Sequence, residues 1–212
     1  IIISKQKPIV NACLKILLNE KNCKSAKFFK NSYDFDSDEK SFYYIDIENE
    51  QIEQYFKPNL LGCHQLINLA TALTTINALK TYITIDKDKT NKAIEKTQWI
   101  GRLEQIEISK KYLNHPQSLI YFDGAHNDNA ARFLALWIKN TPFDGETILI
   151  YGRSSGKNHD SFLKKFKNIV SKILIVEVQN EAKPATINEI KQNIKSDNLN
   201  IKFCNDLFEA II

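Results

Sequence analysis

The chain has 212 residues, of which 43% are hydrophobic and 25% are charged, a composition typical of a globular protein with one or two domains. Its 29 basic and 25 acidic residues give a net charge of +4, and the lysines are scattered, which argues against nucleic-acid binding. No apolar run reaches the roughly 18 residues that span a bilayer, and no signal peptide is recognisable, so we expect a cytoplasmic protein without a membrane partner.

Two features of the residue inventory stand out. The chain starts at Ile1 and contains no methionine, so we expect an unusual start or a position inside a longer protein. The four cysteines, Cys13, Cys23, Cys63 and Cys204, form no C-x-x-C pair, and among the four histidines only His64 adjoins a cysteine. This spacing predicts reduced, buried thiols and no metal site.

The first half of the chain alternates helical and aromatic segments. Helical spacing of apolar residues predicts an amphipathic helix over 8–20, with Pro8 at its first position, and a second helix over 65–82. Aromatic residues with polar breaks over 24–57 predict short antiparallel strands, and a further helix is expected around 90–96. A glycine then interrupts the pattern, and we place a domain boundary after residue 98.

The second half, 99–212, alternates strands and helices. The pattern predicts strands at 118–122, 147–151, 173–178 and 201–204, and helices at 127–139, 160–170, 186–194 and near the end. Asp128 is a candidate cap of the 127–139 helix, and Thr186 with Glu189 fits a capping box. Such alternation predicts a mostly parallel sheet covered by helices, with ligands bound at the carboxyl ends of the strands.

The polar cluster over 121–128 follows the first of these strands. Asp123 ends the strand, Gly124 allows a turn, and His126 precedes a helix whose first amides are free. A carboxylate in this position can accept the two hydroxyls of a ribose, while His126 and the helix N-terminus face the crevice. The alternative is that Asp123 and Asp128 merely cap a turn and a helix.

Two further clusters carry polar groups at glycine junctions. Asn68 falls on the polar side of the helix that begins near His64, where its amide could read a purine edge; the alternative is an exposed or capping residue. Arg102 follows Gly101 at the domain boundary and could pair with phosphate oxygens; the alternative is a solvated arginine.

The segment 152–158, G-R-S-S-G-K-N, is similar to a phosphate loop at first sight. That motif needs four residues between its glycines and Ser or Thr after the lysine, whereas this segment has three residues there and Asn158 after Lys157. We therefore interpret it as a polar loop that lines the same crevice.

Taken in chain order, the three clusters resemble the motifs of one family. G-C-H-Q-L-I-N-L-A-T-A at 62–72 is similar to G-x-H-Q-x-x-N-x-A-T-A, and I-G-R-L-E at 100–104 resembles P-G-R-L-E/Q. D-G-A-H-N-D-N-A-A-R at 123–132 is similar to D-G-A-H-N-P-x-A-A-R, so Ile100 and Asp128 replace prolines. The chain thus resembles the folylpolyglutamate synthase/dihydrofolate synthase family of the Mur ligase superfamily.

This resemblance implies an α/β fold: part of a Mur-ligase central, ATP-binding domain over 1–98, then a Rossmann-like C-terminal domain over 99–212 with a mostly parallel sheet and without its last strand. It implies ATP-binding roles for Asn68 at adenine, Arg102 at the phosphates, Asp123 at the ribose and His126 at the nucleotide. Further residues are expected to line the active site: His64, Gln65, Asn127 and Lys157. No residue is assigned as catalytic or as a metal ligand.

The implied activity is ATP-driven addition of L-glutamate to a folate or dihydropteroate carboxylate through an acyl phosphate. The resemblance places three features of the family before residue 1: the phosphate loop, the Mg²⁺ ligands and the modified lysine. We therefore expect this chain to be inactive alone and to need the N-terminal half, either separately encoded or joined to it. The alternative is a non-catalytic, nucleotide-binding remnant. A nicotinamide-dependent dehydrogenase is disfavoured because G-x-G-x-x-G follows none of the strands.

Overall fold

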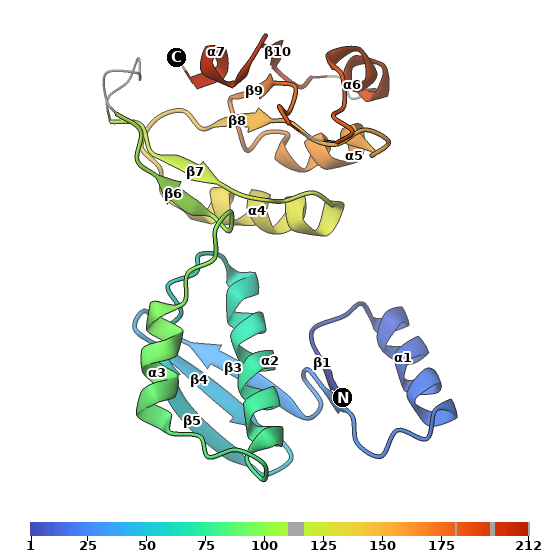
Figure 1. Ribbon diagram of the computed structural model, residues 1–212, viewed down its shortest axis with the longest axis vertical. Coiled ribbons are helices and arrows are strands. Elements are labelled where there is room, and N and C mark those ends of the chain that lie inside the picture. The colour runs from blue at the N-terminus through green and yellow to red at the C-terminus, as the bar shows by residue number, and fades with distance from the viewer. Residues whose placement is uncertain (110–116, 181, 196–197, 212) are drawn as a thin grey trace. The chain divides into compact units, whose positions relative to one another are not determined.

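The computed structural model describes residues 1–109, 117–180, 182–195 and 198–211 (Figure 1). Two compact units make up the chain, Ile1–Ile100 and Gly101–Ile212. The division between them lies close to the boundary expected after residue 98. None of the helices in the described part of the chain combines the length and the apolar character needed to cross a bilayer.

Unit 1 contains a three-stranded antiparallel sheet with two helices against it. Its elements are β1 (Ile2–Ile3), α1 (Pro8–Glu20), β2 (Lys27–Phe28), β3 (Tyr33–Ser37), β4 (Ser41–Asp46), β5 (Gln51–Phe56), α2 (Cys63–Leu79) and α3 (Lys87–Lys96). The sheet order is β3-β4-β5, which confirms the antiparallel strands predicted from the aromatic pattern. β1 and β2 form a separate parallel pair.

The core of unit 1 lies between this sheet and α2. Residues of β4 alternate between buried and half-buried positions, as expected for a strand with one face on a core. Phe42 and Tyr44 of β4 pack with Ala70 and Leu73 of α2. The Tyr44 hydroxyl lies 3.1 Å from Oγ1 of Thr74, so this buried polar group has a partner.

Unit 2 contains a three-stranded parallel sheet and an antiparallel pair. Its elements are β6 (Glu104–Ile106), β7 (Ile120–Phe122), α4 (Asp128–Asn140), β8 (Ile148–Tyr151), α5 (His159–Leu163), the 3₁₀ turn Lys164–Phe166, β9 (Lys172–Ile175), α6 (Ile187–Asn193), β10 (Ile201–Phe203) and α7 (Leu207–Ile211). The parallel order is β10-β9-β8.

Helices cover both faces of this parallel sheet. Ile173 and Ile175 of β9 belong to the larger core cluster, which α4, α5 and α6 complete. Leu174, on the opposite face, packs in a second cluster with Ala210 of α7. A central strand that is buried on both faces is typical of a parallel α/β sheet, so the predicted mixed α/β class with a parallel sheet is confirmed.

Three sequence-based predictions about unit 2 were wrong in detail. The 118–122 strand, expected in the parallel sheet, is β7, and it pairs antiparallel with β6, which was not predicted because it has only three residues. The expected 160–170 helix ends in a 3₁₀ turn at Phe166, shortly before Asn168 takes a left-handed φ of 60°. The cap of α4 is Asn127 rather than Asp128: its Oδ1 accepts the Ala130 N–H at 2.9 Å.

Gly152, directly after β8, occupies a position with no room for a side chain. A Cβ there would lie 2.8 Å from Cγ2 of Val178 and 3.0 Å from the Val176 carbonyl oxygen. We predict that Gly152→Ala destabilises unit 2 by about 1–3 kcal/mol, because the strand must shift to admit the methyl group. Native-state hydrogen exchange of the β8 and β9 amides measures the free energy of unfolding of unit 2 separately from that of unit 1.

Gly124→Ala is the matched control, since a Cβ at Gly124 would lie 3.4 Å from its nearest neighbour, the Gly101 carbonyl oxygen, at ordinary contact distance. Equal destabilisation by both substitutions would contradict the packing argument.

Candidate functional site

The Asp123 carboxylate joins the segment at the domain boundary to the turn after β7. Its Oδ2 accepts the Leu103 N–H at 3.0 Å, and its Oδ1 accepts the Ala125 N–H at 2.9 Å. The Gly124 N–H donates to the Gly101 carbonyl oxygen at 2.8 Å. Two of these hydrogen bonds, Leu103 to Asp123 and Gly124 to Gly101, therefore hold two of the sequence motifs together, although more than fifteen residues separate the motifs along the chain.

The backbone of the boundary segment needs an unusual conformation. Gly101 and Leu103 both have left-handed φ angles, 70° and 49°. A Cβ at Gly101 would lie 3.3 Å from the Phe122 ring, and the Gly101 N–H donates to Oε2 of Glu104 at 2.8 Å. Because glycine takes a left-handed φ without a steric penalty, Gly101 allows the tight turn that presents Arg102.

Arg102 and His126 lie beside the same turn. Arg102 is exposed, and its Nη1 lies 3.6 Å from the position of a Cβ on Gly124, so the guanidinium runs along the backbone of the turn. His126 is exposed, with Nδ1 2.9 Å from the Gly124 carbonyl oxygen. Since a carbonyl only accepts, Nδ1 carries the proton, and Nε2 remains for another group. Arg102, Asp123 and His126 are thus brought together within unit 2.

Arg153, which sequence reasoning missed, supports His126 from the next strand. Its guanidinium donates to the His126 carbonyl oxygen and lies 5.3 Å from the Phe162 ring centroid. At the adjacent helix start, Ser161 Oγ donates to a carboxylate oxygen of Asp128. The signal available in the sequence was a cation directly after Gly152, at the carboxyl end of β8.

In unit 1, the predicted residues of the second motif form a hydrogen-bonded row on the first turns of α2. Gln65 is buried; its Oε1 accepts an Asn68 Nδ2–H at 2.9 Å, and its Nε2 lies 3.1 Å from His64 Nε2. Asn68 is exposed. Gly62 precedes the helix with a φ of 96°. The structure therefore brings His64, Gln65 and Asn68 together and leaves the Asn68 amide at the surface.

The cysteines differ in part from the expectation of buried thiols. All four are free; Cys204 is buried, Cys23 is half-buried, and Cys13 and Cys63 are exposed. Over the described ranges, no group of three or more His, Cys, Asp and Glu side chains could hold a metal ion.

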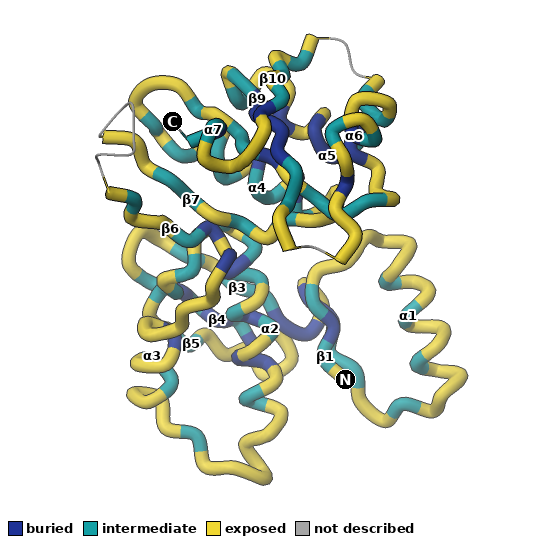
Figure 2. The backbone as a smooth tube through the Cα atoms, turned by 45° about the horizontal axis from the view of Figure 1, so that its top comes forward, coloured by how far each residue is buried: buried dark blue, intermediate teal, exposed yellow. Residues whose placement is uncertain are grey.

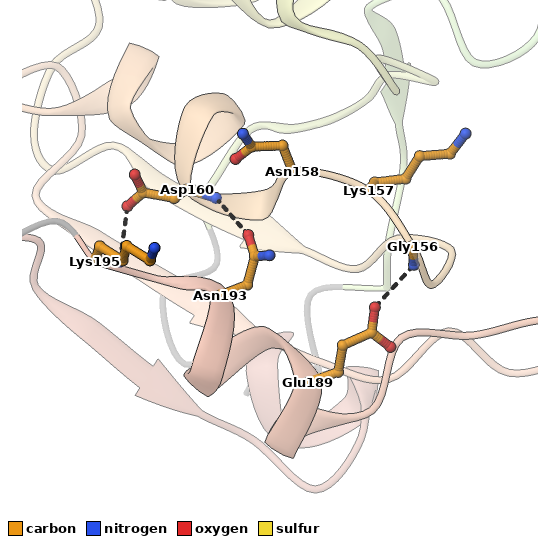
Figure 3. A pocket seen from close by; sticks show the side chains of 7 residues that line it. All are labelled: Gly156, Lys157, Asn158, Asp160, Glu189, Asn193 and Lys195. Carbon is orange, nitrogen blue, oxygen red and sulfur yellow. Dashed lines mark hydrogen bonds between the residues drawn. The ribbon is translucent and has the colours of Figure 1, made fainter.

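The loop after β8 borders a polar surface pocket of about 480 Å³ (Figure 3). Its lining residues come from this loop, α5, α6 and the segment directly after α6: Gly156, Lys157, Asn158, Asp160, Glu189, Asn193 and Lys195. Glu189 accepts the Gly156 N–H at 2.8 Å, and Asp160 accepts the Lys195 N–H at 3.0 Å. Lys157 is therefore placed at this pocket, whose lining includes neither Arg102 nor Asp123.

His159 lies fully buried behind the pocket. Its Nδ1 is 2.8 Å from the Tyr151 hydroxyl, and its Nε2 is 3.8 Å from Oε1 of Glu189. Burial lowers the pKa of His159, the positive Arg153 lowers it further, and Glu189 opposes both. The hydrogen bond from the Gly156 N–H lowers the pKa of Glu189.

We predict that removing the Asp123 carboxylate destabilises unit 2. Asp123→Ala leaves the N–H of Leu103, a residue only 3% exposed, without its acceptor, which costs about 1–3 kcal/mol. Arg102→Ala, at an exposed position, should change stability by less than about 0.5 kcal/mol. Hydrogen exchange of the β8 and β9 amides measures the free energy of unfolding of unit 2 in both variants. An unchanged value for Asp123→Ala would show that the hydrogen bonds of its carboxylate are dispensable.

We predict that His159 titrates below the ordinary histidine pKa of about 6.5. The unfolded chain then takes up a proton at a higher pH than the folded chain does. Acidification below about 6.5 therefore lowers the stability of unit 2, and raising the pH restores it. An NMR titration of the His159 ring checks this, and a midpoint at or above 6.5 would contradict it.

Comparison with protein-family models found no match. Two curated proteins are related in sequence. Dihydrofolate synthetase of Saccharomyces cerevisiae is 24% identical over 123 residues, which are 57% of this chain and 29% of that protein. Dihydrofolate synthase/folylpolyglutamate synthase of Bacillus subtilis is 24% identical over 126 residues, 58% of this chain and 27% of that protein. The chain thus matches less than a third of the length of either relative.

Solved structures share the fold over nearly the whole chain. Mycobacterium tuberculosis folylpolyglutamate synthase, complexed with ADP and AMPPCP, has a TM-score of 0.76 at 17% identity, over 99% of this chain and 46% of that chain. Escherichia coli FolC in complex with DHPP and ADP has a TM-score of 0.73 at 18% identity, over 92% of this chain and 42% of that chain. A bifunctional folylpolyglutamate synthase/dihydrofolate synthase with Mn, AMPPNP and L-glutamate bound has a TM-score of 0.71 at 16% identity, over 92% of this chain and 42% of that chain.

The proteins found by sequence and those found by fold are all dihydrofolate or folylpolyglutamate synthases. The chain is similar in sequence to dihydrofolate and folylpolyglutamate synthases, shares the fold of solved synthases, and spans less than half the length of each.

Proposed function

We propose that this chain is the nucleotide-contacting part of an ATP-dependent ligase that adds L-glutamate to folate, with dihydropteroate as a further acceptor. In this reaction a carboxylate oxygen of the acceptor attacks the γ-phosphorus of ATP, and ADP leaves. The amine of glutamate then attacks the acyl carbon of the acyl phosphate. An amide forms, a proton is lost, and inorganic phosphate leaves.

The observation that carries the proposal is the joining of two motifs around Asp123. Its two hydrogen bonds, to Leu103 and Ala125, gather a cation, a carboxylate and an imidazole at one turn beyond the end of β7. Crevices beyond the carboxyl ends of strands are the usual place for nucleotides in α/β folds. The nucleotides in the solved relatives, ADP, AMPPCP and AMPPNP, support the same assignment.

Each residue of this cluster has a proposed role that suits its chemistry. Arg102, with an exposed guanidinium, offers paired N–H donors to phosphate oxygens. Asp123 uses one hydrogen bond on each oxygen, so each oxygen keeps a lone pair for a ribose hydroxyl. His126 is exposed, and because its Nδ1 is used by the Gly124 carbonyl oxygen, its Nε2 is the atom that meets the nucleotide.

Unit 1 supplies the proposed adenine contact. The Asn68 amide is exposed, and its bond to Gln65 fixes its orientation while leaving its oxygen and a second N–H for a purine edge. Within unit 1 we assign His64 and Gln65 to the lining of this contact. Within unit 2 we assign Asn127 to the lining beside His126, and Lys157 to the polar pocket after β8. We assign residues 1–98 to the central, ATP-binding domain of the ligase and 99–212 to its C-terminal domain.

Magnesium belongs to the proposed reaction as a partner of the nucleotide phosphates. The side chains in the described ranges form no cluster that suits it, so we assign its ligands to another part of the ligase and derive no step through it from these residues. Phosphoryl transfer depends on positioning and charge stabilisation. A chain that contributes only part of this machinery is therefore expected to be inactive alone.

The test is reconstitution. We expect no activity from the chain alone, and ATP-dependent incorporation of labelled glutamate into folate when it is combined with a polypeptide that supplies the phosphate-loop half of a family ligase. Arg102→Ala should reduce the reconstituted rate about 10- to 150-fold, because hydrogen bonds to charged groups are worth about 1.5–3 kcal/mol.

Lys139→Ala, which removes an exposed cation from the last turn of α4, is the control and should leave the rate unchanged. An unchanged rate in both Arg102→Ala and Asp123→Ala would refute the assignments. Nucleotide binding by a reconstituted complex that never turns over would favour the second candidate, a non-catalytic, nucleotide-binding remnant.

A further inference from the structure

Arg153, the second residue after β8, connects the turn that carries His126 to the start of α5. Its Nη2–H donates to the His126 carbonyl oxygen, and its Nη1–H donates to the Asn158 carbonyl oxygen at 3.4 Å. His126 directly precedes the cap of α4, and Asn158 is itself the cap of α5. One guanidinium therefore ties together the starts of two helices.

The backbone and the side chain of Arg153 are both held in place. Its carbonyl oxygen accepts the Ala185 N–H at 3.0 Å, and its guanidinium carbon lies 5.3 Å from the ring centroid of the buried Phe162. Phe162 belongs to α5, which Figure 2 shows as largely buried. A cation over the face of an aromatic ring is attracted to it, so the guanidinium has a defined position between the turn and α5.

No carboxylate competes for this guanidinium. In the part of the chain that the structure describes, none of the ion pairs includes Arg153. The nearby Tyr151 hydroxyl lies 2.8 Å from Nδ1 of the buried His159, whose pKa is lowered by burial and further by Arg153. Arginine most often pairs with a carboxylate, and here the two backbone carbonyl oxygens take that place.

His126 is anchored through its ring and through its carbonyl group. The ring Nδ1–H donates to the Gly124 carbonyl oxygen at 2.9 Å, and the His126 carbonyl accepts from Arg153. The side chain is exposed, so hydrogen bonds rather than packing fix the ring. The hydrogen bond of one imidazole nitrogen decides which nitrogen carries the proton. Without Arg153, the peptide group after His126 would be restrained from its far side by the cap of α4 at Asn127.

We propose that Arg153 is a positioning residue of the nucleotide site: its hydrogen bond to the His126 carbonyl keeps the imidazole in the Nδ1-protonated form and leaves Nε2 for the nucleotide. Arg153 acts through His126 and needs no contact of its own with the ligand. The inference rests on the proposed function in naming the nucleotide as that ligand. The state of the imidazole does not depend on the function, so the chain alone suffices to measure it.

NMR of the isotope-labelled ring nitrogens of His126 tests the positioning, at a pH of about 8, where an imidazole of ordinary pKa is neutral. We expect the Nδ1-protonated form to predominate in the unaltered chain and to fall below about half in Arg153→Met. Methionine keeps an apolar side chain against Phe162 but has no N–H to donate. An unchanged ring in Arg153→Met would overturn the proposal. A ring that populates both neutral forms equally in the unaltered chain would overturn it without any variant.

Arg132→Met is the matched control. Arg132 also lies over an aromatic ring, 4.3 Å from the Phe133 centroid, and donates to Oδ1 of Asn129 at 3.3 Å, but it is exposed on α4 and has no hydrogen bond to His126 in the described ranges. Its replacement should leave the His126 ring unchanged. Hydrogen exchange of the β8 and β9 amides shows that each variant is folded, and equal changes of the ring in both variants would contradict the proposal.

A double-mutant cycle in the reconstituted ligase shows whether Arg153 acts through His126. We expect Arg153→Met to reduce kcat/KM for ATP about tenfold when His126 is present, and at most about twofold after His126→Ala. Equal reductions in both backgrounds would overturn the proposal. A reconstituted ligase that forms no product would refute the proposed function alone, because the NMR measurement on the chain still decides the positioning.

Discussion

The structure of the candidate site depends on one carboxylate. Asp123 accepts backbone N–H groups from Leu103 and Ala125, and the neighbouring Gly124 N–H donates to Gly101. These bonds give the short β6–β7 pair its register, in which Glu104 lies opposite Phe122. They also hold Arg102 beside the turn that leads to His126. A single side chain thus serves both the local fold and the proposed ribose contact.

The same turn is supported from the parallel sheet. Arg153, at the end of β8, donates to the His126 carbonyl oxygen, and Ser161 at the start of α5 donates to Asp128 at the start of α4. The His126 carbonyl and the first residue of α4 are thereby held in place, while the Arg102 and His126 side chains are exposed. Rigid support beneath exposed functional groups is what precise ligand positioning requires.

The elements predicted from the sequence agree best with the structure where a regular apolar pattern extends over many residues. The 17 residues of α2 and the buried strand β9 carry enough apolar positions to define their period and their buried faces. Short elements were missed or misplaced. β6, with three residues, was not predicted, and β7, also with three, was expected in the parallel sheet. Pairing partners of such strands depend on contacts across the chain, which no local pattern contains.

The sequence by itself determined the fold class, the resemblance to one family, and the residue types at the candidate site, because glycine junctions and polar clusters are local and ordered along the chain. Only the tertiary structure decided how they are used. It showed that Asp123 bridges two motifs, that Arg153 supports His126, and that Lys157 lines a polar pocket together with residues of α5 and α6. It also showed that the apolar face of α1 is exposed, because amphipathic spacing predicts a helix with a face to bury but cannot say whether the surface that buries it is present.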